Sequence, residues 1–288
     1  MHVSDVGVQQ TSVPMQRMLY IAGLLVFLVG IQLFILSEQT AQFFAWTINP
    51  PLTAAFLGAA YWASCAIEIA AARQVSWARA RIAVPSVLIF TTLTLIVSLV
   101  HLDRFHLGSD DLPARTAAWV WLAVYALVPP ALALLLLRQL RLPGTDLPRI
   151  APMPAWVIMI LGTHAVLLIL IGLGLLIDPL TTRQLWPWEL TPLTGRAIGA
   201  WALALGIAAT HTIAENDWPR VHVATISYTV FGILEVIALA RYPASFFWNT
   251  PQGWIFLIFL ASVLLVGIYG WRTSLRYLTP GATSRPMK

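Results

Sequence analysis

Charged residues and cysteine are the two classes of residue that this sequence has least of. Of its 288 residues, 10% are charged and 59% are apolar, whereas a soluble globular chain has about 25% charged residues. So few charged side chains cannot cover a protein surface in water, which excludes a soluble enzyme, and so apolar a chain is not a disordered one. The single cysteine, Cys65, excludes a disulfide within the chain and a Cys-x-x-Cys site for a metal or for redox chemistry.

Recognisable catalytic and binding motifs are also missing. The sequence contains no phosphate-binding loop, no Gly-x-Ser-x-Gly, no His-Glu-x-x-His and no glycosylation acceptor. The net charge of +5 does not indicate a nucleic-acid partner, because the basic residues lie in short segments between apolar runs. We therefore expect no cofactor and no nucleic acid. Whether the protein is an enzyme stays open, with a non-enzymatic role favoured.

Long apolar runs are abundant. A helix that crosses a bilayer needs about 20 mostly apolar residues, and the runs in this chain are too long and too evenly apolar for the strands of a barrel. The sequence predicts an all-α, polytopic membrane protein with eight transmembrane helices. The predicted spans are residues 18–36, 52–72, 82–102, 117–137, 155–177, 197–214, 221–240 and 253–271.

Basic residues are divided unequally between the two sides of these spans. Eight spans place both termini on one side, and that side holds 12 of the 17 Lys and Arg residues. By the positive-inside rule, this predicts cytoplasmic termini in a cell membrane of the bacterial inner-membrane type. The predicted segments are a cytoplasmic N-terminal segment (1–17), a first four-helix repeat (18–138), a cytoplasmic linker (139–154), a second four-helix repeat (155–271) and a cytoplasmic tail (272–288).

The two halves of the sequence resemble each other at an offset of 141 residues. Residues 51–60 read PLTAAFLGAA and residues 192–201 read PLTGRAIGAW, which share five identities. At the same offset Trp77 aligns with Trp218, and N-terminal to each block one residue of slippage makes the offset 142. Because four spans are an even number, both halves would insert the same way up. The sequence therefore predicts a parallel duplication about an axis normal to the membrane.

A pattern rich in tryptophan and proline occurs in the second repeat. Residues 186–194 read WPWELTPLT, and Gly199 and Trp201 follow them. The pattern resembles one in uncharacterised bacterial multi-pass membrane proteins with a WPWxLTPLT-type repeat. The resemblance covers the second repeat and, weakly, the first. It implies a multi-pass membrane fold and carries over no activity and no catalytic residue.

Small residues follow the start of the second span in each half. Gly58 and Gly199 each lie four residues after another small residue, and such faces allow membrane helices to approach closely. We therefore expect spans 52–72 and 197–214 to pack tightly, against each other at the axis. Thr53 and Thr194 are the expected N-caps of these two helices.

Polar side chains within the spans are the candidates for chemistry, because such groups are costly in lipid. Tyr61 and Glu68 are spaced to share a face of one helix, and Tyr228 and Glu235 a face of another. We interpret these groups as a polar seam in the bundle interior. A packing role, with hydroxyls bonded to their own helix, is the alternative. The candidates for the seam are Glu68, Glu235, His164, Tyr61, Tyr228 and Thr94.

Two further groupings involve residues of the second half of the chain. Glu68 and His211 lie at nearly the same depth of their spans, which predicts a protonatable pair of these two residues. His211, Glu215 and His222 are weak candidates for metal ligands. A solvated polar turn is the alternative there, and we predict no metal site.

Three functions are compatible with these observations. The first is transport of a small solute or a proton through the polar seam between the two repeats. It is weakened by Pro129-Pro130, which we expect to interrupt the fourth span without a counterpart in the eighth. The second is a non-catalytic scaffold or accessory subunit of a membrane complex. The third is an intramembrane metal- or haem-dependent enzyme. The expected partners are the lipid bilayer and either other membrane subunits or further copies of the chain.

Overall fold

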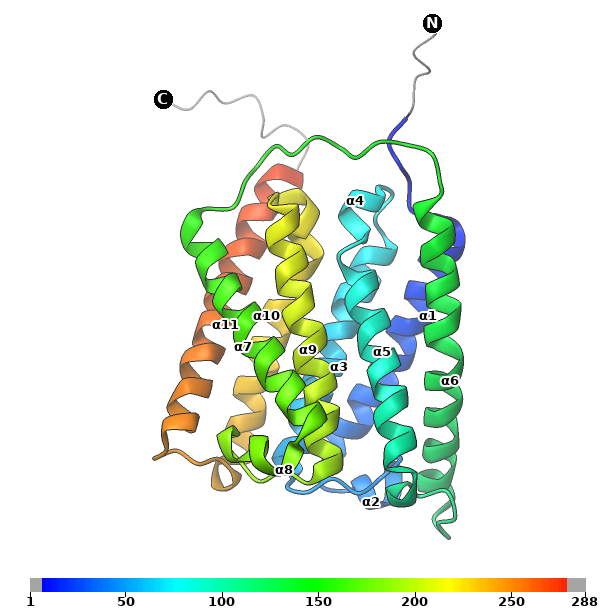
Figure 1. Cartoon of the computed structure of the whole chain (residues 1–288), viewed down its shortest axis with the longest axis vertical. Coiled ribbons are helices and arrows are strands. Elements are labelled where there is room, and N and C mark those ends of the chain that lie inside the picture. Colours follow the sequence, from blue (N-terminus) through cyan, green and yellow to red (C-terminus); the bar gives the residue numbers. More distant parts are fainter. Residues whose placement is uncertain (1–6, 279–288) are drawn as a thin grey trace, which may run out of the picture.

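Helices account for the architecture of residues 7–278, the part of the chain that the computed structural model describes (Figure 1). Within these residues eight helices are long and apolar enough to cross a membrane, as predicted. The ends of the predicted terminal segments, residues 1–6 and 279–288, lie outside the described residues. The long helices are α1 (Val13–Gly30, continued by the π-helix η1, Ile31–Ile35), α3 (Pro51–Ala72), α5 (Ala83–Val100), α6 (Leu112–Leu140), α7 (Ala155–Ile177), α9 (Pro192–Glu215), α10 (Trp218–Arg241) and α11 (Pro251–Leu278).

Short elements connect the long helices at the two ends of the bundle. The helix α4 (Trp77–Ala80) and the linker between α6 and α7 lie at one end, which we call the linker end. The helices α2 (Thr40–Phe43) and α8 (Pro179–Thr182) lie at the opposite end, which we call the α8 end. The 3-10 turns are η2 (Leu102–Arg104), η3 (Arg183–Leu185) and η4 (Pro243–Ser245).

Proline in the first turn begins several of the helices. This position suits proline, because the first N–H groups of a helix have no partner within it. In α9 the cap is Thr191, whose side chain accepts from the backbone N–H of Thr194 in a reciprocal capping box. Thr194 and its counterpart Thr53 are therefore the third residues of their helices. Our prediction that these two threonines are the N-caps is wrong.

The Pro129-Pro130 pair lies inside α6 and does not end it. The prediction of an interrupted fourth span is therefore wrong. Proline removes a hydrogen bond and crowds the preceding turn, but apolar membrane helices tolerate it when local adjustments and neighbouring groups satisfy the freed carbonyls. The last helix, α11, also continues beyond the predicted end at residue 271, to Leu278.

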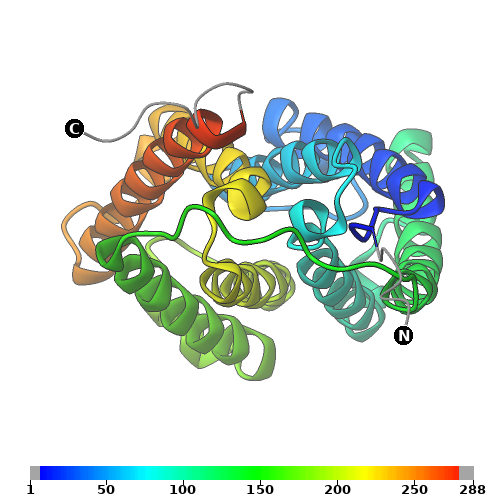
Figure 2. The ribbon, with the colours of Figure 1, turned by 90° about the horizontal axis from the view of Figure 1, so that it is seen from above.

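The long helices form two groups that are in contact at the middle of the bundle (Figure 2). The first group consists of α1, α3, α5 and α6, and the second of α7, α9, α10 and α11. Within the groups α1 packs on α3, α7 packs on α9, and α10 packs on α11. Across the middle α3 packs on α10, and α5 packs on α9. The helix α3 is the most buried of the eight and α6 is the least.

Small residues do allow close approach, but between other helices than those predicted. Gly58 of α3 lies against the backbone of Leu33 and Phe34 in η1, and Gly199 of α9 lies against the carbonyl of Gly172 in α7. The helices α3 and α9 themselves have little contact, so our prediction that they pack tightly against each other is wrong. The grooves left by the glycines are filled by the preceding helix in the chain.

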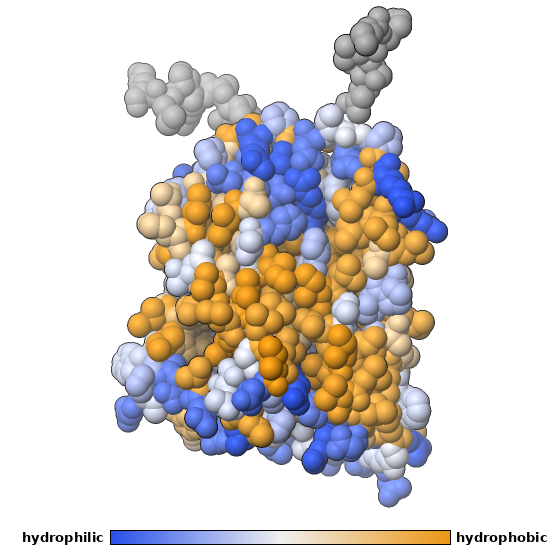
Figure 3. All heavy atoms as spheres, in the orientation of Figure 1, coloured by the Kyte–Doolittle hydropathy of each residue, from blue (hydrophilic) through white to orange (hydrophobic). Residues whose placement is uncertain are grey.

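The surface of the bundle carries a broad apolar band, with polar residues gathered at both ends (Figure 3). Exposed Leu, Ile and Val side chains on the outer helices form this band. An apolar surface of this kind suits contact with hydrocarbon, where helices also satisfy all of their backbone groups internally. The architecture is that of an integral, multi-pass membrane protein.

Candidate functional site

A small cavity lies where the two groups of helices meet. It has a volume of about 70 Å³, which is room for several water molecules or one small solute. Its walls come mainly from α3, α5, α9 and α10, and Met153 of the linker contributes on the side of the linker end. Small and apolar side chains dominate the lining. The hydroxyl-bearing residues among them are Ser64, Ser86, Thr212, Thr225, Ser227 and Tyr228.

Glu68 lies one helical turn beyond the cavity-lining Ser64 and is 1% exposed. Its Oε1 atom accepts a hydrogen bond from the Ser64 hydroxyl at 2.9 Å, and its Oε2 atom has no partner among residues 7–278. We expected a polar partner from another helix, and Ser64 belongs to the same helix, so that expectation is wrong. The hydroxyl of Ser64 therefore connects the cavity to a buried carboxyl group.

Tyr61 lies on the same helix and has a different partner. Its hydroxyl is 2.7 Å from that of Tyr125 in α6, and both side chains are buried. The ring of Tyr61 meets Trp201 edge-on, with 5.1 Å between the ring centroids. Tyr61 therefore connects α3 to α6 of the same group and to α9 of the other group.

His164 and Tyr228 come together in the second group of helices. The Nε2 atom of His164 lies 2.7 Å from the hydroxyl of Ser262 in α11, and its Nδ1 atom lies 3.4 Å from the hydroxyl of Tyr228 in α10. This small network connects α7, α10 and α11, and Tyr228 also lines the cavity. Two of the predicted seam residues are thus neighbours in the structure.

Glu235 and Thr94 are buried without a hydrogen-bond partner in the described chain. Neither carboxyl oxygen of Glu235 has one, although the residue is 1% exposed, and the Oγ1 atom of Thr94 has none either. The residues occupy corresponding positions, since the offset between them is 141. The predicted seam is therefore divided into separate pairs and single groups instead of one continuous line.

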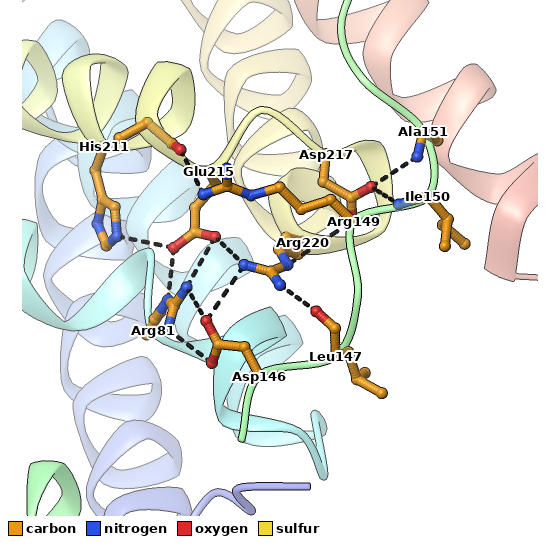
Figure 4. Close-up of polar contacts among 11 residues, drawn as sticks. Arg81, Asp146, Leu147, Arg149, Ile150, Ala151, His211, Glu215, Asp217 and Arg220 are labelled. Carbon is orange, nitrogen blue, oxygen red and sulfur yellow. Dashed lines mark hydrogen bonds and ion pairs between the residues drawn. The ribbon is translucent and has the colours of Figure 1, made fainter. Parts of the chain in front are cut away.

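A cluster of ion pairs closes the linker end of the bundle (Figure 4). Glu215, the last residue of α9, accepts from the Nε and Nη2 atoms of Arg81 at 2.5 and 3.0 Å, and from Nη1 of Arg220 at 3.0 Å. The Nε2 atom of His211 lies 3.4 Å from the same carboxylate. Arg220 and Glu215 are almost completely buried. The cluster joins the first group of helices, through Arg81, to the second.

The linker is fastened into this cluster. Its Asp146 lies 2.7 Å from Arg81, and Arg220 donates to the backbone carbonyl of Leu147. The Oδ1 atom of Asp217 accepts from the backbone N–H groups of Ile150 and Ala151, at 2.7 and 2.8 Å.

These contacts also determine the protonation state of Arg81. Burial lowers the pKa of its guanidinium, but the hydrogen bonds and the Coulombic attraction of Glu215 and Asp146 together outweigh burial and hold the pKa above its ordinary value. Arg81 therefore stays charged, as its pairing with two carboxylates requires.

The candidate metal ligands are not gathered in one place. No group of three or more His, Cys, Asp or Glu residues within positions 7–278 is arranged to hold a metal. Glu215 faces two guanidinium groups, and the Nδ1 atom of His222 lies 2.7 Å from the hydroxyl of Ser274. Cationic neighbours disfavour a bound cation at Glu215.

The predicted pair of Glu68 and His211 is not formed in the structure. Glu68 is bonded to Ser64, whereas His211 faces Glu215 at the linker end. The matching depths of the two residues along their helices therefore do not make them partners.

At the α8 end, several polar contacts connect the two groups of helices, among them one from Arg241 of α10 to the carbonyl of Phe34 in η1. Trp188 donates from Nε1 to Oγ1 of Thr53 at 3.0 Å, and Arg196 donates from Nη1 to Nε2 of His101 at 2.8 Å. The hydroxyl of Tyr242 lies 2.7 Å from that of Ser37. Burial, followed by the positive charge of Arg196, lowers the pKa of His101.

Sequence reasoning missed the residues that hold the linker end together. Arg81 and Arg220 were considered only as loop charges that orient the chain, and Asp146 was not considered. The signal was a short turn between two apolar helices in which Arg220 follows Glu215 by five residues and Asp217 by three. Acidic and basic residues so close together predict an ion pair. Tyr125 and Ser262, the partners of Tyr61 and His164, have no such signal.

Comparisons with protein-family models, with curated proteins and with solved structures give no match to this chain. The resemblance to multi-pass proteins with a WPWxLTPLT-type repeat therefore stays a prediction.

Proposed function

We propose that the protein consists of two parallel four-helix repeats, α1–α6 and α7–α11, which descend from one duplicated unit. Hydrogen bonds at the linker end support this. The backbone N–H of Trp77 donates to the carbonyl of Gln9 at 3.0 Å, and that of Trp218 to the carbonyl of Ala151 at 2.9 Å. The donors are 141 residues apart and the acceptors 142. The linker thus makes the contact in the second half that residues before α1 make in the first.

Hydrogen bonds at the α8 end repeat in the same way. His106 donates from its backbone N–H to the carbonyl of Ala45, and Phe247 donates to that of Pro187, both at 2.9 Å. These residues again differ by 141 and 142 positions. Contacts between backbone groups at both ends do not depend on side-chain composition, so apolar composition alone does not account for them.

We propose further that both termini and the linker lie in the cytoplasm of a cell with a bacterial-type inner membrane. The excess of Lys and Arg at the linker end supports this orientation. A periplasm-active reporter fused at Asp111, in the α5–α6 connection at the α8 end, should be active. A cytoplasm-active reporter fused after Lys288 should also be active. The opposite pair of results would contradict the orientation.

We propose that the protein transports protons, alone or together with a small, weakly polar solute, through the junction of its two repeats. The observation that carries the proposal is the polar connection from the central cavity through Ser64 to Glu68. An ionised carboxyl group that is buried with one hydrogen bond is costly, so we propose that Glu68 carries a proton in this conformation. The closed ion-pair cluster at the linker end is consistent with a state shut on that side.

Proton flux into proteoliposomes tests this function directly. Vesicles loaded with a pH-sensitive dye and driven by a potassium diffusion potential should acidify faster with the protein than without it. Glu68→Gln keeps the shape of the side chain and the bond from Ser64 but removes the exchangeable carboxyl proton, so it should reduce the flux to that of empty vesicles. Gln74→Glu, which places a carboxyl group at the linker end away from Ser64, is the matched control and should not reduce it.

A failure of the flux experiment would favour the alternative function, a non-catalytic scaffold. A protein that carries no protons, and whose Glu68→Gln variant is as stable as the natural chain, would have no use for this carboxyl group beyond packing. The third hypothesis, an intramembrane enzyme with a metal at Glu215, is disfavoured by the two arginines that bind that residue.

A further inference from the structure

A second and larger hollow lies between α7 and α11, toward the α8 end. It has a volume of about 420 Å³, which is within the range of about 300–1,000 Å³ typical of ligand sites. We call it the lateral cleft. Its lining includes Leu167 and Gly174 of α7, Ala202 of α9 and Ile255 of α11. It shares a wall with the central cavity, but most of its lining comes from the second group of helices.

The entrance of the lateral cleft is apolar and faces outward. Leu170 and Ile255, on opposite sides of the entrance, are 63% and 60% exposed. Both belong to the apolar band that suits contact with lipid, and both lie on the outer helices of the second group. In a membrane the cleft would therefore open sideways into hydrocarbon and would not be filled by bulk water.

The floor of the cleft is a rigid group of aromatic rings. Phe56 meets Trp186 edge-on with 5.5 Å between centroids, and Trp186 meets Phe256 at 6.0 Å. Trp201, Phe231 and Phe259 extend this floor toward the middle of the bundle. Rings that already pack on one another give a preformed apolar surface, which loses little conformational freedom when a ligand binds.

Polar groups are found at one end of the cleft. Gln252, at the start of α11, and Thr182, at the end of α8, line it where the bundle meets its polar margin. The indole Nε1–H of Trp186, which also lines the cleft, has no hydrogen-bond partner in residues 7–278. A buried donor without a partner calls for one outside the chain. The cleft is thus apolar along most of its length and offers donors near the α8 end.

We propose that the lateral cleft binds one acyl chain of a membrane phospholipid. The chain lies along the aromatic floor, and the ester region of the lipid lies at the end with Thr182 and Gln252. A lipid is the occupant that this site fits, because it reaches the cleft sideways from the bilayer and has its polar atoms at one end. The proposal depends on membrane insertion and does not depend on proton transport.

The first repeat shows why only one such cleft is expected. The position in α3 that corresponds to Ala202 is occupied by Tyr61, whose ring is buried and bonded to Tyr125. An aromatic ring fills the space there that a methyl group leaves open in the second repeat. A similar exchange, Ala202→Phe, should therefore fill the lateral cleft with an aromatic ring, as Tyr61 does in α3.

Photo-crosslinking in vesicles tests the proposal. The protein is reconstituted into palmitoyl-oleoyl phosphatidylcholine with a small fraction of phosphatidylcholine that carries a diazirine on one acyl chain. After illumination, mass spectrometry of peptides should find label on Leu205 and Phe259 inside the cleft, and on the lipid-facing Leu134 of α6. Ala202→Phe should lower the label in the cleft about tenfold, because the ring displaces several methylene groups, and should leave Leu134 unchanged.

Ala126→Phe is the matched control, since it adds the same ring to the exposed face of α6 and should change neither signal. Label on Leu134 but none on Leu205 or Phe259 would show that the cleft holds no acyl chain. Equal labelling of the cleft in Ala202→Phe would also overturn the proposal, as would a co-purified apolar molecule of another class that blocks the label. If Ala202→Phe does not fold, Leu168→Trp fills the cleft from α7 and should lower the label on Phe259. No label at Leu134 would instead contradict membrane insertion.

Discussion

The two halves of the molecule share their backbone contacts and differ in the side chains that those contacts enclose. Both halves have a backbone hydrogen bond at Trp77 or Trp218, and both have a glycine, Gly58 or Gly199, against the preceding helix. Yet the first half has Glu68 where the second has Ala209. Geometry is therefore set by elements common to the halves, whereas candidate chemistry is set by residues present in one half only.

The ion-pair cluster should give the largest difference between the two halves in the free energy of unfolding. Arg220→Met removes the guanidinium from between Glu215 and Asp217, which leaves buried carboxylates with fewer partners. We expect a loss of about 3–5 kcal/mol in the free energy of unfolding, measured by titration with denaturing detergent in mixed micelles. The corresponding residue of the first half is Arg79, which makes no ion pair among the described residues.

Arg79→Met is therefore the matched control and should cost less than about 1 kcal/mol. Equal losses for the two variants would mean that the cluster is no stronger than a surface charge, and the contrast between the halves at this end would disappear.

Substitutions of Glu235 and Thr94 should give the next largest difference between the halves in the free energy of unfolding. Replacement of a buried polar group that lacks a partner by an apolar group removes a desolvation cost, so Glu235→Leu should raise the free energy of unfolding by about 1–3 kcal/mol. Thr94→Val removes one neutral hydroxyl group at the corresponding position and should raise it less. The same titration measures both. A Glu235→Leu variant that unfolds more easily would show that Glu235 has a partner outside the chain.

The positions of the helices could be predicted from the sequence, but the contacts between them could not. The eight helices and their order follow from the length and spacing of apolar runs. Which helices pack together does not follow, because nearly every face is apolar: Gly58 indicated a close approach but not that Leu33 would fill it. Pro129-Pro130 misled for a related reason, since rules from soluble helices overstate the effect of proline in an apolar bundle.

The candidate site was predictable only residue by residue. Glu68, Glu235 and His164 stand out because ionisable groups are rare in apolar spans, and all three are buried. The partner of His164 was not predictable, because Ser262 looks like any other small residue in a membrane helix. Ser64 was better indicated, since it lies four residues before Glu68 on the same helical face. The cluster at Arg220 joins segments that are 134 residues apart in the case of Arg81 and Glu215, and such long-range pairs leave no periodic signal.

The two tryptophans before α3 and α9 test the comparison at the α8 end. Trp188 donates from Nε1 to Thr53, whereas Nε1 of its counterpart Trp46 has no partner in the described chain. Trp188→Phe and Trp46→Phe both lose ring volume, but only the first loses a hydrogen bond. Trp188→Phe should therefore cost about 1 kcal/mol more in unfolding free energy. Equal costs would mean that this bond adds nothing to the link between the halves.

His101 gives the smallest effect and the one that depends on pH. Its pKa is lowered from the ordinary value of 6.5, so between the lowered value and 6.5 the unfolded chain binds more protons than the folded chain. The contribution of His101 is complete above pH 6.5 and is lost as the pH falls below it. Because the side chain is partly exposed, the loss should stay below about 1 kcal/mol.

Thermal unfolding in detergent between pH 7.5 and 5 would measure this loss, and His101→Gln should make the curve flatter by the same amount. A variant whose pH dependence equals that of the natural chain would assign the slope to other groups. Arg196→Gln should also flatten it, since the charge beside His101 is then removed.

The exchange of contacts at the middle of the bundle has a consequence for the origin of the chain. In the duplication that we propose, α3 corresponds to α9 and α5 corresponds to α10, so the α3–α10 and α5–α9 interfaces would be the same pair of surfaces used twice. A surface that meets its own copy in this way is the interface of a homodimer with two-fold symmetry. Before fusion, the ancestral gene would have encoded a self-associating protein of half this length. The linker would then be the N-terminal arm of the second protomer, still in its original place, and the carboxyl groups found in one half only would have arisen after the two copies were free to diverge.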